Sequence, residues 1–240
     1  MVIIFLRMLV RKVIFSILNL FDHHKEKIPN LFLQIFKKHP NFLRKDKQRI
    51  RVCVNEIIRY LGLIDHLIEV GSERKIRHIN PKIINVLRLG IYELVFDDIT
   101  PDFAAIHSSV ELAKKNINKK SSSMVNAVMR NIQRISQKNK KWKMSLIKNK
   151  IDLAYPEWLL KKWEDEFGKD VTRNLCAEFL NKKDIFIRLD IDRYSVDKML
   201  SVLSHSNIKV IQHNHFKLFF KVVLGQKNIL DNNLFHNGII

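Results

Sequence analysis

Residues 81–97 read PKIINVLRLGIYELVFD, and this stretch decides the fold. Its apolar side chains fall on nearly every side of a helix, which is typical of a central helix that other helices surround. Asn80 is a suitable N-terminal cap, and Pro81 suits the first turn. A glycine inside a helix costs about 1 kcal/mol relative to alanine, so we expect another helix to approach Gly90 closely. The residues that we expect to be buried here are Leu87, Gly90, Ile91 and Leu94.

The sequence around this stretch also has helical periodicity. Thr100-Pro101-Asp102 predicts the start of a helix, because a capping residue, a proline and an acid follow one another there. Ser121-Ser122-Ser123 predicts the start of the next helix. Further helices are predicted over 4–21, 28–37 and 44–70, the last one ended by Gly71-Ser72. Five or six helices with short loops predict an all-α bundle over residues 1–140.

After the bundle the pattern changes to shorter elements. Residues 141–152 are polar and basic, and we interpret them as a linker or a frayed helix. Residues 153–240 combine helical and strand-favouring segments, which predicts a small α+β domain. The predicted helices are 157–167, 170–180 and 196–203, and the predicted strands are 184–189, 208–212 and 217–224. The fold class is therefore mainly α.

Composition excludes several classes of protein. Of the 240 residues, 46% are hydrophobic, which excludes a wholly disordered chain. Six glycines and five prolines disfavour a turn-rich all-β fold. The longest uncharged run near the amino terminus, Val13–Phe21, is too short to cross a bilayer. We expect an amphipathic core helix there, with a helix lying on a membrane surface as the alternative.

Residues suited to catalysis or metal binding are scarce. No nucleotide-binding, hydrolase or zinc-protease motif occurs. His23-His24 and the pair His213 and His215 have no second ligand cluster, so we expect surface histidines and no metal site. Cys53 and Cys176 have no ligand-like spacing and fit packed thiols in a reducing cytoplasm. No catalytic residue is predicted.

Positive charge is concentrated in one part of the chain. The sequence has 43 Lys and Arg against 24 Asp and Glu, a net charge of +19. Residues 112–150 contain twelve bases and no acid. Arg130 and Arg134 recur on a different helix face from Val125 and Val128. A solvated basic surface is the alternative, but the pattern favours a polyanionic partner.

Four motifs, in order, carry a resemblance to a known family: Leu87–Leu94 (LRLGIYEL), Pro101–Ala105, Val110–Lys114 (VELAK) and Val125–Arg130 (VNAVMR). They resemble the core of the NusB-like RNA-binding domain, in the version that begins bacterial ribosomal RNA cytosine-C5 methyltransferases of the RsmB/Sun/Fmu family. Tyr155–Leu159 (YPEWL) and Ile187–Asp190 (IRLD) resemble later segments of that family. The resemblance runs from about residue 44 to the end of the sequence.

The resemblance implies an RNA-binding front portion that positions 16S ribosomal RNA in the cytoplasm. It also implies that the sequence stops before the family's methyltransferase domain, so S-adenosylmethionine and activity would belong to that missing domain or to a separately encoded one. A stand-alone NusB-like factor in transcription antitermination is the alternative, against which the YPEWL segment argues. A purely protein-binding helical domain is a third alternative, which the absence of acids in residues 112–150 does not favour.

On this reading, two groups of bases would contact RNA phosphates. The main group is Lys114, Lys115, Lys119, Lys120, Arg130, Arg134, Lys138, Lys140, Lys141 and Lys143. The second, weaker group is Arg44, Lys45, Lys47, Arg49 and Arg51. Three positions depart from the family pattern. Glu56 replaces a glycine that the family usually has, Glu93 replaces a glutamine, and Asp190 replaces an asparagine. A glutamate at a packing point needs a partner if it is buried.

Overall fold

The computed structural model describes residues 2–24, 26–137, 142–181, 184–229 and 232–240. Two compact units form, Met1–Leu180 and Asn181–Ile240. The first unit is helical, and the second contains a three-stranded sheet. The prediction of a mainly α fold with a small α+β part is confirmed.

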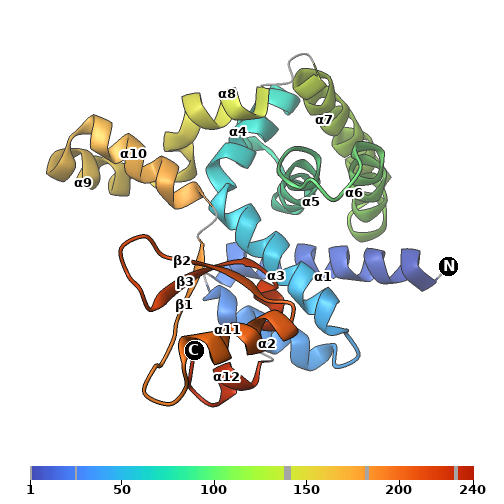
Figure 1. Cartoon of the computed structure of the whole chain (residues 1–240). Helices are drawn as coiled ribbons and strands as arrows, with labels where there is room; N and C mark the ends of the chain where they lie inside the picture. The colour runs from blue at the N-terminus through green and yellow to red at the C-terminus, as the bar shows by residue number, and fades with distance from the viewer. Residues whose placement is uncertain (1, 25, 138–141, 182–183, 230–231) are drawn as a thin grey trace. The chain divides into compact units, whose positions relative to one another are not determined.

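The first unit is a bundle around one central helix. Helix α5 (Pro81–Ile91) contacts helices from both earlier and later parts of the chain, as Figure 1 shows. The surrounding helices are α1 (Val2–His24), α4 (Leu61–Ser72), α6 (Asp102–Asn116) and α7 (Lys119–Gln137). Helices α2 (Ile28–Lys38) and α3 (Arg44–Arg59) pack against α1.

Helix α5 has the predicted cap and core. The side chain of Asn80 accepts a 2.9 Å hydrogen bond from the backbone N–H of Lys82. Leu87, Gly90 and Ile91 are buried, as are most of their neighbours in α5, whereas Leu94 is only partly buried. A Cβ atom added at Gly90 would lie 2.5 Å from Ser109 Oγ of α6 and 2.9 Å from Met129 Sδ of α7. The expected close approach at Gly90 is therefore present.

The helix over 81–97 does not continue as an α-helix to its predicted end. After Ile91 it changes to a π-helical turn, η2 (Tyr92–Phe96). The N–H of Asp97 bonds the carbonyl oxygen of Tyr92 at 3.0 Å, five residues back. This turn contains one residue more than an α-helical turn would.

The prediction of one helix over 44–70 is wrong in its middle. The chain leaves helical geometry at Tyr60 (φ −99°, ψ 16°), which divides the segment into α3 and α4. The ring of Tyr60 stacks on Phe96 at 4.6 Å between centroids. This contact comes from a segment distant in sequence, so helical periodicity does not report it.

Two predicted helix starts also differ in detail. Thr100 does not cap α6, because its hydroxyl donates to Asp97 Oδ2 at 2.7 Å. Helix α7 begins at Lys119, before the predicted serines. Asn118 accepts a 2.8 Å hydrogen bond from the N–H of Ser121 and so satisfies a free donor of the first turn.

Residues 142–180 belong to the first unit. They form α8 (Trp142–Lys150), η3 (Ile151–Ala154), α9 (Glu157–Phe167) and α10 (Lys169–Leu180). Ile151, Cys176 and Leu180 form a small core with Leu63 of α4. Residues 142–150 are therefore helical, which fits the second of the two interpretations, a helix and not a linker. The compact units divide after Leu180, whereas the predicted division lay near residue 153, because this core joins α10 to the bundle.

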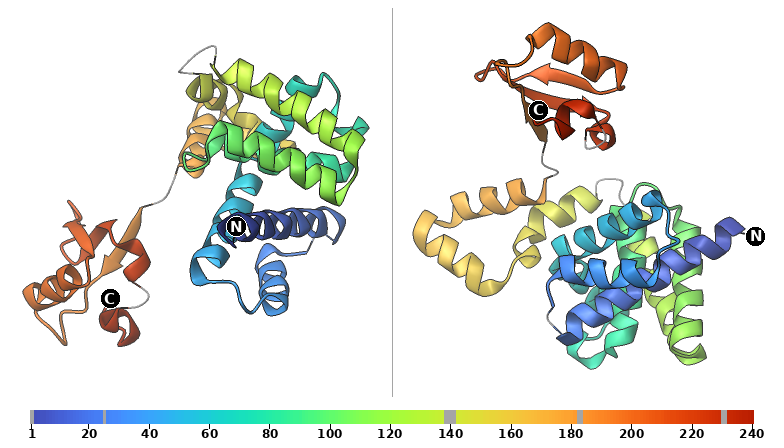
Figure 2. Two further views of the ribbon diagram at one scale, coloured as in Figure 1. Left: turned by 90° about the vertical axis from the view of Figure 1, so that its right-hand side faces the viewer. Right: turned by 90° about the horizontal axis from the view of Figure 1, so that it is seen from below.

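The second unit is an antiparallel sheet with helices on one face (Figure 2). Its elements are β1 (Ile185–Arg188), α11 (Val196–His205), β2 (Lys209–Gln212), β3 (Phe219–Leu224) and α12 (Asn233–His236), near the predicted positions. The strand order is β1-β3-β2, with a register shift between Lys209 and Val210. Ile187, Phe220 and Val222 point into a core that α11 and α12 cover.

Candidate nucleic-acid interface

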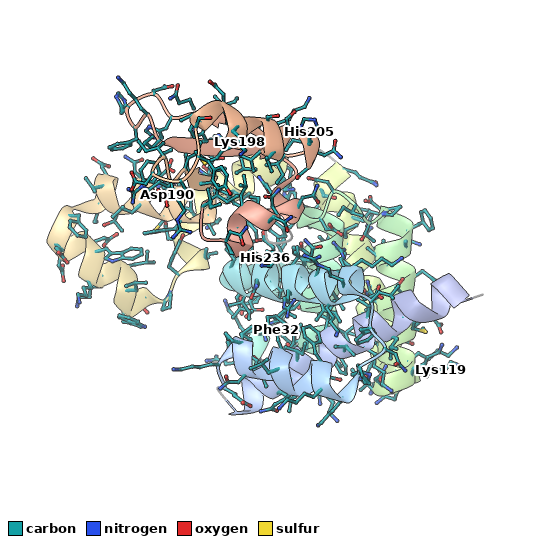
Figure 3. The ribbon with its side chains drawn as sticks, turned by 60° about the horizontal axis from the view of Figure 1, so that its bottom comes forward. Phe32, Lys119, Asp190, Lys198, His205 and His236 are labelled. Carbon is teal, nitrogen blue, oxygen red and sulfur yellow. The ribbon has the colours of Figure 1, made fainter. Side chains whose placement is uncertain are left out.

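Four lysines cluster where α6 ends and α7 begins. Lys114 and Lys115 lie in the last turn of α6, and all four side chains are exposed. Cations are stabilising near the C-terminus of a helix, where the helix dipole is negative, but not near the N-terminus, where it is positive. Lys119 and Lys120 nevertheless occupy the first turn of α7, which has no acid. Figure 3 shows Lys119 at the edge of the bundle. This corner combines four positive charges with the start of a helix, and both favour an anion.

Arg130 and Arg134 lie on the exposed side of α7. The opposite side of the helix buries Val125, Val128 and Ile132, so helical spacing separates the two groups. Arg130 donates to Gln133 Oε1 at 3.0 Å. Neither arginine forms an ion pair within the described part of the chain. Fifteen residues separate Lys119 from Arg134, so the cationic face of α7 extends for roughly 22 Å.

One acid lies beside this face although the sequence block has none. Asp102 at the start of α6 accepts hydrogen bonds from the side chains of Gln133 (3.3 Å) and Gln137 (3.4 Å). The packing of α6 on α7 therefore brings a carboxylate next to the end of α7. Residues 112–150 contain no acid in the sequence, but the fold places Asp102 beside them.

The structure adds one arginine that the sequence did not indicate. Arg74 lines a shallow depression together with Gly71, Met124 and Arg134. Asn131 Nδ2 donates to the carbonyl oxygen of Gly71 at 3.1 Å and holds the end of α4 against α7. Arg74 and Arg134 are sixty residues apart in sequence, so no local pattern could have joined them.

The remaining members of the main group differ in their surroundings. Lys143 lies 3.7 Å from the exposed Asp98 and 5.9 Å from the ring centre of Phe96. Lys115 lies 3.8 Å from Glu111, one helical turn earlier. Both charges are therefore partly balanced by an acid. Lys138, Lys140 and Lys141 lie outside the described residues.

The second predicted group divides among different faces of α3. Arg44 and Lys45 are exposed, and Arg51 lies 4.9 Å from the ring centre of Phe36. Lys47 lies 5.9 Å from the same ring. A charge over an aromatic face is stabilised by the ring quadrupole, so these two cations have a structural role as well.

Arg49 differs from the other members of the predicted RNA-binding group, because its guanidinium has partners within the bundle. Its guanidinium donates to both carboxylate oxygens of Asp97, at 3.1 and 2.5 Å, and to Thr100 Oγ1 at 3.3 Å. Burial acts against the charge of Arg49, but the hydrogen bonds to Asp97 raise its pKa above the ordinary value. Burial likewise opposes the Asp97 carboxylate, yet Arg49 and Thr100 lower its pKa. Arg49 therefore holds α3 to the end of η2.

Two departures from the family pattern have partners. The buried Glu93 pairs with Arg11 of α1, which also donates to Ser109 Oγ at 2.8 Å. Burial lowers the pKa of Arg11 to about 10, still well above neutral pH. Glu56 is partly exposed and pairs with Arg59. The expected need for a partner is met at both glutamates.

The surroundings of Cys53 and the topology of the sheet bear on catalysis and cofactor binding. Cys53 is buried, and burial raises its pKa to about 11, so its thiol is a poor nucleophile. Within the described ranges no group of three metal-ligating side chains occurs, and no helix is long and apolar enough to span a bilayer. The described residues do not fit S-adenosylmethionine, because their sheet is antiparallel and lacks a parallel strand leading through a glycine-rich turn into a helix.

Two family models match the chain: the first lies within the first unit, and the second begins just before α9 of the first unit and continues into the second unit. The NusB family model matches residues 7–134. The model of the RsmF/B-like methyltransferase ferredoxin-like domain matches residues 155–219.

Two curated relatives have the same name. The probable ribosomal RNA small subunit methyltransferase B of Synechocystis sp. is 30% identical over 176 residues, which are 72% of this chain and 39% of the relative. The protein of that name from Bacillus subtilis is 28% identical over 169 residues, 68% of this chain and 36% of the relative. The chain spans less than two fifths of either relative.

A solved structure matches the first unit. The crystal structure of antitermination factors NusB and NusE in complex with dsRNA superposes with a TM-score of 0.51 and 25% identity. The match covers 54% of this chain and 97% of that chain. The chain belongs to the NusB family, and its NusB domain is followed by a ferredoxin-like domain of the RsmF/RsmB type.

Proposed function

We propose that this chain binds ribosomal RNA and positions it for a cytosine-C5 methyltransferase of the small-subunit type. The observation that carries the proposal is the exposed cationic face of α7, where Lys119, Lys120, Arg130 and Arg134 lie without ion-pair partners among the described residues. The NusB chain in the solved complex is one of two antitermination factors crystallised with double-stranded RNA. The ferredoxin-like match favours a methyltransferase over an antitermination factor.

The chemistry of this binding is electrostatic. Lys and Arg that neutralise phosphates release condensed counterions, which makes the affinity depend steeply on salt. Phosphate contacts fix the position of the RNA but do not read its bases. The cationic face would therefore hold a folded RNA of suitable shape with little sequence preference.

We do not expect the described residues to carry out methyl transfer by themselves. The described residues offer no fit for S-adenosylmethionine, and no cysteine among them is suited to attack a base. We expect isothermal titration calorimetry to detect no S-adenosylmethionine binding to this chain. Micromolar binding would contradict this part of the proposal.

A salt series tests the RNA-binding role. Fluorescence anisotropy with a structured 16S ribosomal RNA fragment should give a slope of log affinity against log salt of roughly −3.5 to −4.5, if about five phosphates are contacted. Arg130→Glu together with Arg134→Glu should weaken binding and flatten the slope. Lys161→Glu together with Lys162→Glu on α9 is the matched control, because both lysines are exposed and lie outside the predicted group. A salt-independent affinity, or equal losses from both variants, would contradict the proposal.

A further inference from the structure

The second unit leaves one face of its sheet open, and aromatic side chains lie on it. Phe186 of β1 is 45% exposed and Phe219 of β3 is 38% exposed. Phe216, in the turn before β3, is 60% exposed. Large exposed rings lose the stabilisation of burial, so a cluster of them usually marks a binding surface.

The strand register places these rings together. Phe186 is paired with Lys221, and Arg188 with Phe219, across β1 and β3. Because side chains alternate between the two faces of a sheet, all four lie on the face opposite the buried Ile187 and Phe220 side chains. Ile211 of β2 is also paired with Lys221 and is 59% exposed on the same face.

A histidine joins the rings into one cluster. The centre of the His213 ring lies 5.6 Å from that of Phe186 and 5.1 Å from that of Phe216. Phe216 and Phe219 are 5.8 Å apart. His213 Nδ1 accepts hydrogen bonds from the backbone N–H groups of His215 (3.1 Å) and Phe216 (3.3 Å), which hold the imidazole in place. The rings are therefore arranged before any ligand arrives.

The charges around the rings select the class of ligand. Arg188 and Lys217 are exposed, and Lys221 lies at the centre of the face. The Lys221 ammonium is 2.7 Å from Asp184, an exposed carboxylate just before β1. Rings interleaved with cations are suited to a chain that carries both flat bases and phosphates. Docking of an apolar protein surface would instead remove water from the charges of Arg188 and Lys221 without giving them a partner.

We propose that this open face of the β1-β3-β2 sheet binds single-stranded RNA by stacking unpaired bases on Phe186 and Phe219. The inference rests on the proposed function, since it assumes that the ligand is RNA. It adds a second site of different chemistry, because α7 would contact phosphates of a folded RNA whereas the sheet would contact exposed bases. Stacking tolerates any base, so this site has little sequence preference.

The test uses the full chain and two fluorescein-labelled RNAs, a 12-nucleotide single strand of uridines and a duplex of equal length. Phe186→Leu with Phe219→Leu removes both rings and keeps apolar bulk, so that folding is preserved. We expect this variant to bind the single strand about tenfold or more weakly, with unchanged duplex affinity. Phe186→Tyr with Phe219→Tyr should keep the affinity. Phe235→Leu is the matched control, because Phe235 is 41% exposed on α12.

The outcomes separate this inference from the proposed function. Single-strand affinity that is equal in wild type and the leucine variant overturns the stacking site and points to a protein surface as its occupant. Absence of single-strand binding by the wild-type chain overturns it as well, even if the duplex binds. If the single strand binds through the two rings and folded ribosomal RNA does not bind at all, the stacking site stands and the role of α7 fails.

Discussion

The carbonyl oxygen of Leu153 lies directly against the α-carbon of Gly62, 1.7 Å from where a Cβ atom would stand. Only glycine allows the backbone of η3 to approach the first turn of α4 this closely. This contact, with the small core around Leu63 and Ile151, attaches residues 142–180 to the bundle.

Gly62→Ala should therefore destabilise the first unit. The added methyl group would meet backbone atoms that cannot rotate away, and overpacking of this kind costs about 1–3 kcal/mol. Gly71→Ala is the matched control, because its methyl group would meet flexible side-chain atoms of Ile132 and Val128 at 2.9–3.0 Å. Urea unfolding should show the larger loss for Gly62→Ala. Equal losses would mean that the Leu153 contact is not needed.

Gly90→Leu should destabilise the centre of the bundle. Ser109 and Met129 already fill the space beside Gly90, so a larger side chain must displace α6 or α7. We expect a loss of at least about 1–3 kcal/mol in the free energy of unfolding, measured by thermal or urea denaturation. Unchanged stability would show that α5 is not the packed centre.

Arg49→Ala should reduce stability and leave RNA affinity unchanged. The substitution leaves the Asp97 carboxylate, whose side chain is 4% exposed, without its strongest partner. Hydrogen bonds to charged groups contribute about 1.5–3 kcal/mol, so a loss of this order is expected. Gln48→Ala is the matched control, because Gln48 is exposed on the same helix and belongs to neither predicted RNA-binding group. A selective loss of RNA affinity in Arg49→Ala would return Arg49 to the interface.

The same pair predicts a pH dependence. Burial opposes the Asp97 carboxylate, but Arg49 and Thr100 lower its pKa below the ordinary value of 3.8. A carboxylate with a lowered pKa stabilises the folded state fully above the unfolded pKa, and this contribution disappears as the pH falls through the folded pKa. Wild type should lose more stability than Asp97→Asn between pH 5 and about pH 2. Parallel stability curves for the two proteins would contradict the lowered pKa.

Periodicity predicted most of the elements because helices and strands differ in the spacing of their buried residues. The α9 range 157–167 and the three strands of the second unit follow from this spacing. What periodicity missed depends on contacts between distant segments. The break at Tyr60 follows its stacking on Phe96, and Arg49 meets an acid 48 residues later.

The candidate interface was predictable in part for the same reason. The exposure of Arg130 and Arg134 follows from their spacing relative to Val128 and Ile132 on one helix. The position of Asp102 beside α7 and of Arg74 beside Arg134 depends on how helices pack, which charge runs do not encode. The sheet face was missed because its rings come from three separate segments.

The π-helical turn at Tyr92–Phe96 constrains which insertions and deletions this chain tolerates. A deletion of one residue there would restore an α-helical turn and rotate the following backbone by about 100° around the helix axis. Asp97 would then point away from Arg49 and leave that guanidinium without its acid. The number of residues in the η2 turn and the residue type at position 49 should therefore covary among related sequences. Relatives whose turn is one residue shorter should carry a neutral side chain at position 49.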